Sequence, residues 1–125
     1  MIIGIGIDII EIARVAAMRQ RHGARFERKL FTPREIEYCR RHKKADQHFA
    51  VRFAAKEAAM KALGTGLAKK IGFLCIEVTK NASGKPELHL RKAAAAQAKR
   101  LGMRQAHLSV SHSDEWAAAV VIMEG

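Results

Sequence analysis

The sequence predicts an α+β domain in which antiparallel strands and hairpins pack on helices. Two pairs of strand-like segments are each joined by a short turn, which is typical of hairpins. Helical segments lie between these pairs without the strict strand–helix alternation of a Rossmann fold, which favours the α+β class. The length of 125 residues suits one domain, 1–125, and 49% of the residues are apolar, enough for a core of its own.

The first expected strand, residues 2–10, contains a carboxylate. "IIGIGIDIIEI" is an apolar run rich in β-branched residues, which predicts a strand buried on both faces. Asp8 lies in its middle, although Asp is a poor strand former and is costly to bury alone. We therefore expect hydrogen bonds, a cation or a raised pKa at Asp8. The run is neither a signal peptide nor a membrane span, because Asp8 and Glu11 interrupt it.

Two helices are expected next. Residues 11–20 continue from the strand as a helix, and a glycine interrupts the following segment. In "FTPREIEYCRRH", Thr32 as N-cap, Pro33 at the first helical position and Glu35 at the third predict a capping box.

Residues 48–63, "HFAVRFAAKEAAMKAL", form the strongest expected helix, which ends at a glycine. Glu57 and Lys61 lie four residues apart and therefore share one face. Ala50 and Ala54 fall on the same side and leave room for something to approach the helix.

The ordinary interpretation of such a helix face is a solvated one. A Glu–Lys pair at this spacing stabilises a helix by about 0.3–0.5 kcal/mol without any further role. Arg52 and Lys56, on a neighbouring side, are expected to be solvated as well.

The second half of the chain predicts hairpin, helix, hairpin. The strands of the first hairpin are residues 73–79 and 86–90, and "KNASGK" is its turn. A helix over residues 91–102 follows. Residues 106–112 and 116–123 form the last hairpin, joined by the polar turn "SDE".

Asp8 and Glu57 together would form a site for a hard cation. Mg²⁺ in proteins is usually held by one or two carboxylates, with water and substrate phosphates completing the octahedron. A nearby Lys61 would then serve as a point charge for phosphate. This combination fits phosphoryl transfer, provided that the strand and the helix meet.

The end of the strand before "SDE" carries Ser111 and His112. A Ser–His nucleophile pair is not expected, because adjacent strand residues point to opposite faces. Two interpretations of His112 stay open: a turn histidine satisfied by Ser113 or Asp114, and a contact to a phosphate or diphosphate.

The formal net charge of +11 predicts an anionic partner, which could be a nucleic acid, a phosphorylated ligand, an acidic protein or a membrane surface. Residues 14–44 hold eleven basic and three acidic side chains. Aromatic residues do not interleave with them, which disfavours a single-stranded nucleic acid. Cys39 and Cys75 lack metal-binding spacing, so reduced, mostly buried thiols of a cytosolic protein are expected.

Five segments occur in an order that resembles the holo-[acyl-carrier-protein] synthases, the short bacterial class of 4′-phosphopantetheinyl transferases. The resemblance runs from Ile2 to about Ile122, and the combination of its motifs is specific. The segments are "GIGIDIIEIARV", "FTPREIEYC", "RFAAKEAAMKALGTG", "GKPEL" and "LSVSHSDEWAAAVVI". Trp116 departs from the tyrosine expected there.

This resemblance implies the 4′-phosphopantetheinyl transferase fold and a Mg²⁺-dependent reaction. The family transfers 4′-phosphopantetheine from coenzyme A to a serine of apo acyl carrier protein and releases adenosine 3′,5′-bisphosphate, in support of fatty acid biosynthesis. The implied protein is a cytoplasmic homotrimer with sites at subunit interfaces, and it acts on neither nucleic acid nor membranes.

The resemblance also implies roles for individual residues. A carboxylate, directly or through a metal-bound water, would accept the serine proton. The implied metal ligands are Asp8 and Glu57, and the phosphate contact that assists the leaving group is Lys61. Coenzyme A would contact Arg52, Lys85, Pro86 and His112 as well, and the acidic carrier would bind Arg14, Arg21 and Arg25.

Two other functions remain open on the sequence. A basic RNA- or DNA-binding module would need only the positive charge, and its binding would not depend on Asp8 or Glu57. A divergent member of the same family would bind coenzyme A without transferring any part of it.

Overall fold

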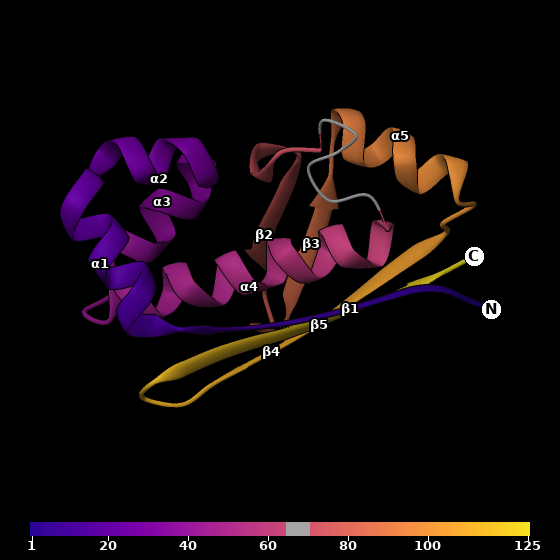
Figure 1. Ribbon diagram of the computed structural model, residues 1–125. Helices are drawn as coiled ribbons and strands as arrows, with labels where there is room; N and C mark the ends of the chain where they lie inside the picture. Colours follow the sequence, from indigo (N-terminus) through magenta and orange to yellow (C-terminus); the bar gives the residue numbers. More distant parts are fainter. Residues whose placement is uncertain (65–70) are drawn as a thin grey trace.

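The structure, a computed structural model, describes residues 1–64 and 71–125. The α+β class predicted from the sequence is confirmed, with helices and strands in the expected order (Figure 1). In chain order the elements are β1 (Ile2–Glu11), α1 (Ile12–His22), α2 (Ala24–Leu30), α3 (Pro33–Arg40), α4 (Ala45–Leu63), the 3₁₀ helix η2 (Phe73–Cys75), β2 (Ile76–Lys80), β3 (Pro86–Leu90), α5 (Lys92–Arg100), β4 (Gln105–His112) and β5 (Trp116–Glu124).

Two antiparallel sheets surround the long helix α4. The larger sheet has the strand order β1–β5–β4, and the smaller is the β2–β3 hairpin. Helix α4 runs along β1 and β5, while α1 to α3 gather at its beginning and α5 lies near its end (Figure 1). None of the helices in the described ranges has the length and apolar character needed to cross a bilayer.

The contact between β1 and α4 is made by backbone. A Cβ atom at Gly6 would lie 1.8 Å from the carbonyl oxygen of Ala58, and one at Gly4 would lie 2.3 Å from that of Ala62. Side chains at either glycine are therefore excluded, and only glycine lets the strand lie this close to the helix. The small residues of α4 that allow the approach are Ala58 and Ala62, not the pair nearer its beginning that the sequence suggested.

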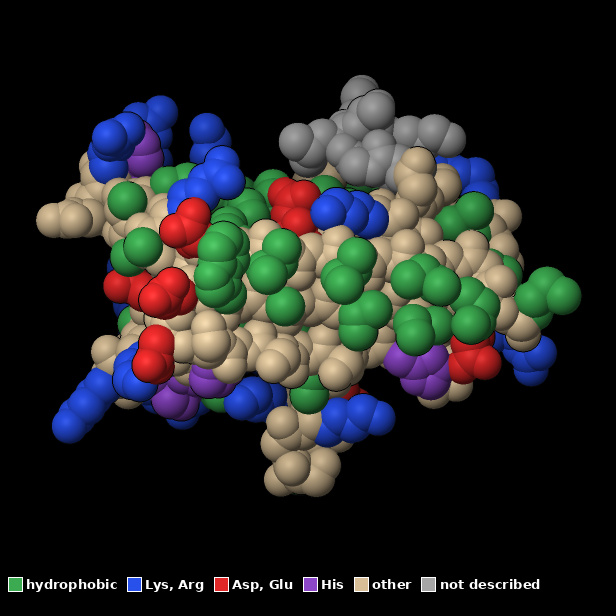
Figure 2. Space-filling view, turned by 60° about the horizontal axis from the view of Figure 1, so that its bottom comes forward, with side chains coloured by type: hydrophobic (Ala, Val, Ile, Leu, Met, Phe, Trp, Pro, Cys, Tyr) green, Lys and Arg blue, Asp and Glu red, His purple; other side chains and the backbone are tan. Residues whose placement is uncertain are grey.

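The two faces of β1 differ, so the prediction that this strand is buried on both faces is wrong. Gly6 and Ile10 face α4 and are buried, whereas Ile5, Ile7 and Ile9 are 60%, 66% and 62% exposed. The residues paired with these isoleucines on β5 continue the same surface. We call it the outer sheet face: Ile5, Ile7, Ile9, Trp116, Ala118, Val120 and Ile122. Hydrophobic side chains gather across this side of the molecule in Figure 2.

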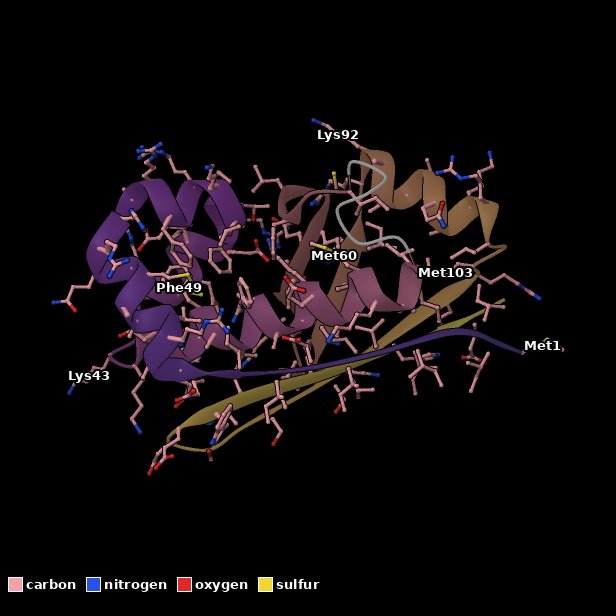
Figure 3. All side chains as sticks on the ribbon, in the orientation of Figure 1. Met1, Lys43, Phe49, Met60, Lys92 and Met103 are labelled. Carbon is pink, nitrogen blue, oxygen red and sulfur yellow. The ribbon has the colours of Figure 1, made fainter. Side chains whose placement is uncertain are left out.

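Helix α4 is enclosed on its other side by α1, α3, β2 and α5. Phe49 and Met60 lie in the interior, whereas Lys43 and Lys92 point outward (Figure 3). This enclosure explains why the expectation of solvated Arg52 and Lys56 side chains is wrong. Arg52 is 2% exposed and Lys56 is 0% exposed.

Lys56 is held by acceptors from three parts of the chain. Its Nζ atom donates to Glu35 Oε1 at 2.6 Å, to the Leu30 carbonyl at 2.7 Å and to the Phe73 carbonyl at 3.1 Å. Burial lowers the pKa of Lys56, and the Glu35 carboxylate offsets part of that effect. A buried lysine without such partners would be strongly destabilising.

Glu35 also completes the capping box that the sequence predicted at the start of α3. The Thr32 side chain accepts a hydrogen bond from the Glu35 backbone N–H, and Glu35 Oε1 accepts one from the Thr32 N–H at 2.8 Å. Its other oxygen accepts from the Val78 N–H of β2 at 2.8 Å. One carboxylate thus ties α3, α4 and β2 together.

The largest differences from the predicted elements are three. Residues 73–75 form a 3₁₀ helix where the sequence predicted the start of a strand, and α4 begins three residues earlier than expected, at Ala45. The chain after the glycine break forms a helix of its own, α2. Both cysteines are free, with Cys39 buried and Cys75 half-buried, in line with the expectation of reduced thiols.

Replacing Gly6 with alanine tests the backbone contact between β1 and α4. The added Cβ would overlap the Ala58 carbonyl, which belongs to a helix and cannot move alone. We expect a loss of about 2–4 kcal/mol in the free energy of unfolding, measured in urea.

Gly72→Ala is the matched control. Apart from its two chain neighbours, no heavy atom of residues 1–64 and 71–125 lies within 4 Å of a Cβ built there, and its φ of −88° suits any residue. Equal stability of the two variants would contradict the close approach.

Candidate functional site

Asp8 and Lys61 meet at the contact between β1 and α4. The Lys61 Nζ atom donates to Asp8 Oδ1 at 3.1 Å and to the carbonyl oxygen of Ile7 at 2.9 Å. The Asp8 side chain is 16% exposed and that of Lys61 is 54% exposed. The partner that the sequence required for a carboxylate in this strand is therefore an ammonium group from the helix.

The charges of Asp8 and Lys61 both affect the pKa of Glu57. Burial raises the pKa of Glu57, the negative charge of Asp8 raises it further, and Lys61 partly offsets the two effects. Two carboxylates and one ammonium therefore share a site between strand and helix. Folding disfavours the ionised form of Glu57. The stability that this group contributes is therefore fully present below its ordinary pKa and is lost as the pH rises through its raised pKa in the folded protein.

The donor set of this site suits a hard divalent cation. Asp8 and Glu57 offer carboxylate oxygens and repel one another, which a cation between them would relieve. In residues 1–64 and 71–125, no three histidine, cysteine or acidic side chains gather around one point. A closed zinc site of four protein ligands is therefore absent from this part of the chain, whereas Mg²⁺ needs only one or two carboxylates.

A second group of cations surrounds Tyr38. The guanidinium of Arg52 lies 4.1 Å from the centre of the Tyr38 ring, that of Arg41 lies 5.5 Å away, and the Lys80 ammonium lies 5.6 Å away. These residues and Asn81 line a pocket of about 410 Å³ between α3 and β2. The Nε atom of Arg52 is buried there without a hydrogen-bond partner within the described chain.

The potential around this pocket is positive. Burial lowers the pKa of nearby His48 to about 4, and His42, Arg52, Lys80 and His112 lower it in the same direction. A neutral imidazole beside so many cations indicates a place where an anion would be favoured. We call this place the Arg52 pocket.

The remaining predicted coenzyme A contacts lie in two places. His112 is near the beginning of α4, and Lys85 and Pro86 are at the β2–β3 turn. His112 lies exposed at the end of β4 and its Nε2 atom is 3.1 Å from Gln47 Nε2, so neither Ser113 nor Asp114 satisfies it as one interpretation expected. The Ser113 hydroxyl instead accepts the N–H groups of Glu115 and Trp116.

Lys85 is exposed and Pro86 half-buried in the turn that follows Asn81. Asn81 Oδ1 accepts the Lys85 N–H at 3.0 Å and so fixes the turn beside the Arg52 pocket.

These contacts are not all brought to Asp8 within one chain. Gln47, the partner of His112, precedes Glu57 by ten residues, about 15 Å along the helix. Arg52 lies between the two. The structure thus places Glu57 in the second half of α4, the Arg52 pocket nearer the beginning of the helix, and His112 beside its first turn.

The predicted carrier-binding arginines are exposed on α1 and α2. Arg14 and Arg21, seven residues apart, face solvent together, and Arg25 follows on α2. Arg19 does not join them, because its guanidinium pairs with Glu27 at 3.0 Å and with Asp46 at 2.6 Å. The basic segment therefore separates into outward-facing arginines and others, Arg19 and Arg40, that join helices through Glu27.

Sequence reasoning missed Tyr38 and Gln47. Tyr38 belongs to the segment "FTPREIEYC" but was given no role, and Gln47 lies outside the quoted segments. The basic residues near Tyr38 come from α3, α4 and β2, so their convergence needs the tertiary fold. The signal that was available was the aromatic ring three residues before Arg41, at helical spacing.

The chain belongs to the 4′-phosphopantetheinyl transferase superfamily, whose family model matches residues 4–121. Its curated relatives are holo-[acyl-carrier-protein] synthases, which confirms the resemblance seen in the motifs. The protein from Koribacter versatilis is 48% identical over 99% of both chains, and that from Maridesulfovibrio salexigens is 46% identical over the same share.

Solved structures agree. The holo-[acyl-carrier-protein] synthase from Neisseria meningitidis has a TM-score of 0.91 at 34% identity, and the alignment covers 100% of both chains. The Helicobacter pylori enzyme, whose structure is a complex with coenzyme A, has a TM-score of 0.84 at 33% identity and is matched over 96% of this chain and 99% of that one.

The electrostatic contact between Asp8 and Glu57 can be tested by replacing Asp8 with asparagine. Removing the Asp8 charge should lower the pKa of Glu57, because that charge is the second largest cause of its raised value. Carbon NMR of the labelled glutamate carboxyls measures this pKa directly.

Asp114→Asn, in the exposed turn between β4 and β5, is the matched control and should leave the pKa of Glu57 unchanged. An unaltered value in Asp8→Asn would show that the two carboxylates do not share a site.

Proposed function

We propose that the chain is a Mg²⁺-dependent holo-[acyl-carrier-protein] synthase. It transfers the 4′-phosphopantetheine group of coenzyme A to a serine of an apo acyl carrier protein and releases adenosine 3′,5′-bisphosphate, in support of fatty acid biosynthesis in the cytoplasm. The observation that carries this proposal is the meeting of Asp8, Glu57 and Lys61 at the β1–α4 contact, in a chain that belongs to the transferase superfamily.

Each charged group has a role that follows from its position. Asp8 and Glu57 would hold Mg²⁺, which when bound neutralises negative charge on the substrate diphosphate. The Lys61 ammonium is exposed enough to contact the phosphate and stabilise charge on the leaving group.

In the reaction the serine oxygen forms a bond to the phosphorus of the phosphopantetheine group, and the bond from that phosphorus to the bisphosphate leaving group breaks. Burial and the Asp8 charge raise the pKa of Glu57, which makes it a stronger base than an ordinary carboxylate, so a carboxylate of the Asp8–Glu57 pair would accept the serine proton. Positioning and charge neutralisation supply most of the rate in such a transfer.

The nucleotide and the carrier would use the other basic surfaces. The Arg52 pocket, with Lys85 and Pro86 at its turn, suits the phosphates of coenzyme A. Arg14, Arg21 and Arg25 face solvent without a carboxylate partner in the described chain, which suits an acidic carrier protein. Complementary charge of this kind chiefly speeds and orients encounter.

Glu57→Gln tests the transfer reaction. Purified protein, coenzyme A and Mg²⁺ should increase the mass of an apo acyl carrier protein by one phosphopantetheine group, as measured by mass spectrometry. The variant should lower the rate by at least about a hundred-fold, because a carboxylate that binds cation or proton is gone.

The fold of Glu57→Gln should be intact, and its stability at neutral pH should be equal or greater, since the ionised form of Glu57 is disfavoured in the folded state. An unchanged carrier mass with the parent protein would refute the transferase proposal. Full activity in Glu57→Gln would refute the role of Glu57.

We also propose that the protein is a homotrimer with its sites at subunit interfaces. The outer sheet face is a continuous apolar surface, and Ile5, Ile7 and Ile9 are each at least 60% exposed in one chain. Soluble monomers rarely leave such a patch open. A neighbouring copy would cover it, and sharing sites between copies would allow His112 and Asp8, which are apart within one chain, to serve the same substrate.

Ile7→Glu tests this assembly, because an ionised carboxylate in a buried apolar interface is strongly unfavourable. Light scattering should give three times the chain mass of 13.9 kDa for the parent and a single chain mass for the variant. Trp116, the single tryptophan, lies on the outer sheet face, so its fluorescence should shift to longer wavelength in the variant.

Leu101→Glu is the control, because Leu101 is 37% exposed at the end of α5, away from the outer sheet face. This variant should keep the mass of three chains. A parent protein of one chain mass would refute the homotrimer.

A further inference from the structure

Lys61 already acts as a cation at the Asp8 carboxylate. Its Nζ atom lies 3.1 Å from Asp8 Oδ1, and the Ile7 carbonyl accepts a second hydrogen bond from it at 2.9 Å. The ammonium is therefore fixed by two oxygens of β1, one of which belongs to the side chain that would also hold a metal. A divalent cation and an ammonium both seek the same oxygen.

The charges at this site make simultaneous binding unfavourable. With Asp8 and Glu57 ionised, Lys61 leaves the group with one net negative charge. If a divalent cation were added while the ammonium stayed in place, the group would carry one net positive charge, and the two cations would repel each other. Releasing Lys61 from Asp8 removes that repulsion and frees an ammonium next to an incoming phosphate.

Lys61 can be released without disturbing the core. Its side chain is 54% exposed, and its ammonium group is carried on a flexible aliphatic chain at the surface of α4. Lys56, five residues earlier on the same helix, shows the opposite arrangement: it is fully buried and bound by three acceptors. Of these two lysines, Lys61 alone has room to change its partner.

We propose that Lys61 competes with the divalent cation for Asp8, holding the carboxylate before the metal binds and moving to the substrate diphosphate once it has bound. This inference rests on the proposed metal site at Asp8 and Glu57. Competition by Lys61 would make the metal bind weakly by itself and more tightly together with coenzyme A, because the diphosphate gives the displaced ammonium a new partner. By linkage, the metal strengthens binding of coenzyme A by the same factor.

The test measures Mn²⁺ binding without any turnover. Electron paramagnetic resonance counts free Mn²⁺ in a titration of the intact protein, first without and then with coenzyme A. Lys61→Met should bind Mn²⁺ roughly two- to five-fold more tightly than the parent in the absence of coenzyme A, since a competing charge is gone. Its further gain on adding coenzyme A should be smaller than that of the parent.

Two control variants separate charge from structure. Lys99→Met removes an equal charge from the exposed end of α5 and should bind Mn²⁺ as the parent does. Lys61→Arg keeps the charge and should also bind as weakly as the parent. Tighter binding by Lys61→Arg, or equal or weaker binding by Lys61→Met, would overturn the competition.

Asp8→Asn separates this inference from the metal site itself. If Asp8→Asn binds Mn²⁺ as well as the parent, the proposed metal site is wrong. If Asp8→Asn loses Mn²⁺ while Lys61→Met equals the parent, the metal site stands and only the competition by Lys61 is refuted.

Discussion

The close approach of β1 to α4 is the constraint on which the rest of the structure depends. Gly4 and Gly6 let the strand backbone reach the carbonyls of Ala62 and Ala58, where any side chain would overlap. Asp8 is two residues beyond Gly6 and therefore faces the same helix, on which Glu57 and Lys61 lie about one turn apart. The strand geometry that excludes side chains at the glycines thus delivers a carboxylate to the candidate site.

Helix α4 serves two different purposes on its two sides. Toward α3 and β2 it carries Lys56, which binds Glu35 and joins three elements of the core. Toward β1 it carries Glu57 and Lys61, which remain accessible enough for chemistry. Because the core holds the helix through Lys56, the positions of the next charged residues along it are fixed as well.

Local signals in the sequence were sufficient for several features. The capping box at Thr32 and Glu35 was predicted correctly because it depends on four neighbouring residues only. Asp8 attracted attention because a carboxylate within an apolar run requires a partner, and Lys61 is such a partner. Both the order of the elements and the α+β class followed from periodicity and turn residues, which are equally local.

Other features depend on packing between distant segments and could not be predicted this way. Lys56 and Lys61 look alike in the sequence, and only the enclosure of α4 on its far side buries one of them. The apolar run of β1 predicted burial on both faces, but hydrophobicity alone does not tell the face that packs on α4 from the one that stays exposed in a single chain. The Arg52 pocket combines residues of α3, α4 and β2, so no single segment announces it.

The central claim is that the β1–α4 contact brings Asp8 and Glu57 into one cation site. The most direct measurement is an anomalous difference map from crystals grown with Mn²⁺ and coenzyme A. We expect one strong peak within bonding distance of a carboxylate oxygen of both Asp8 and Glu57, with Lys61 turned toward the diphosphate. A peak that contacts neither carboxylate, or only surface histidines, would contradict it.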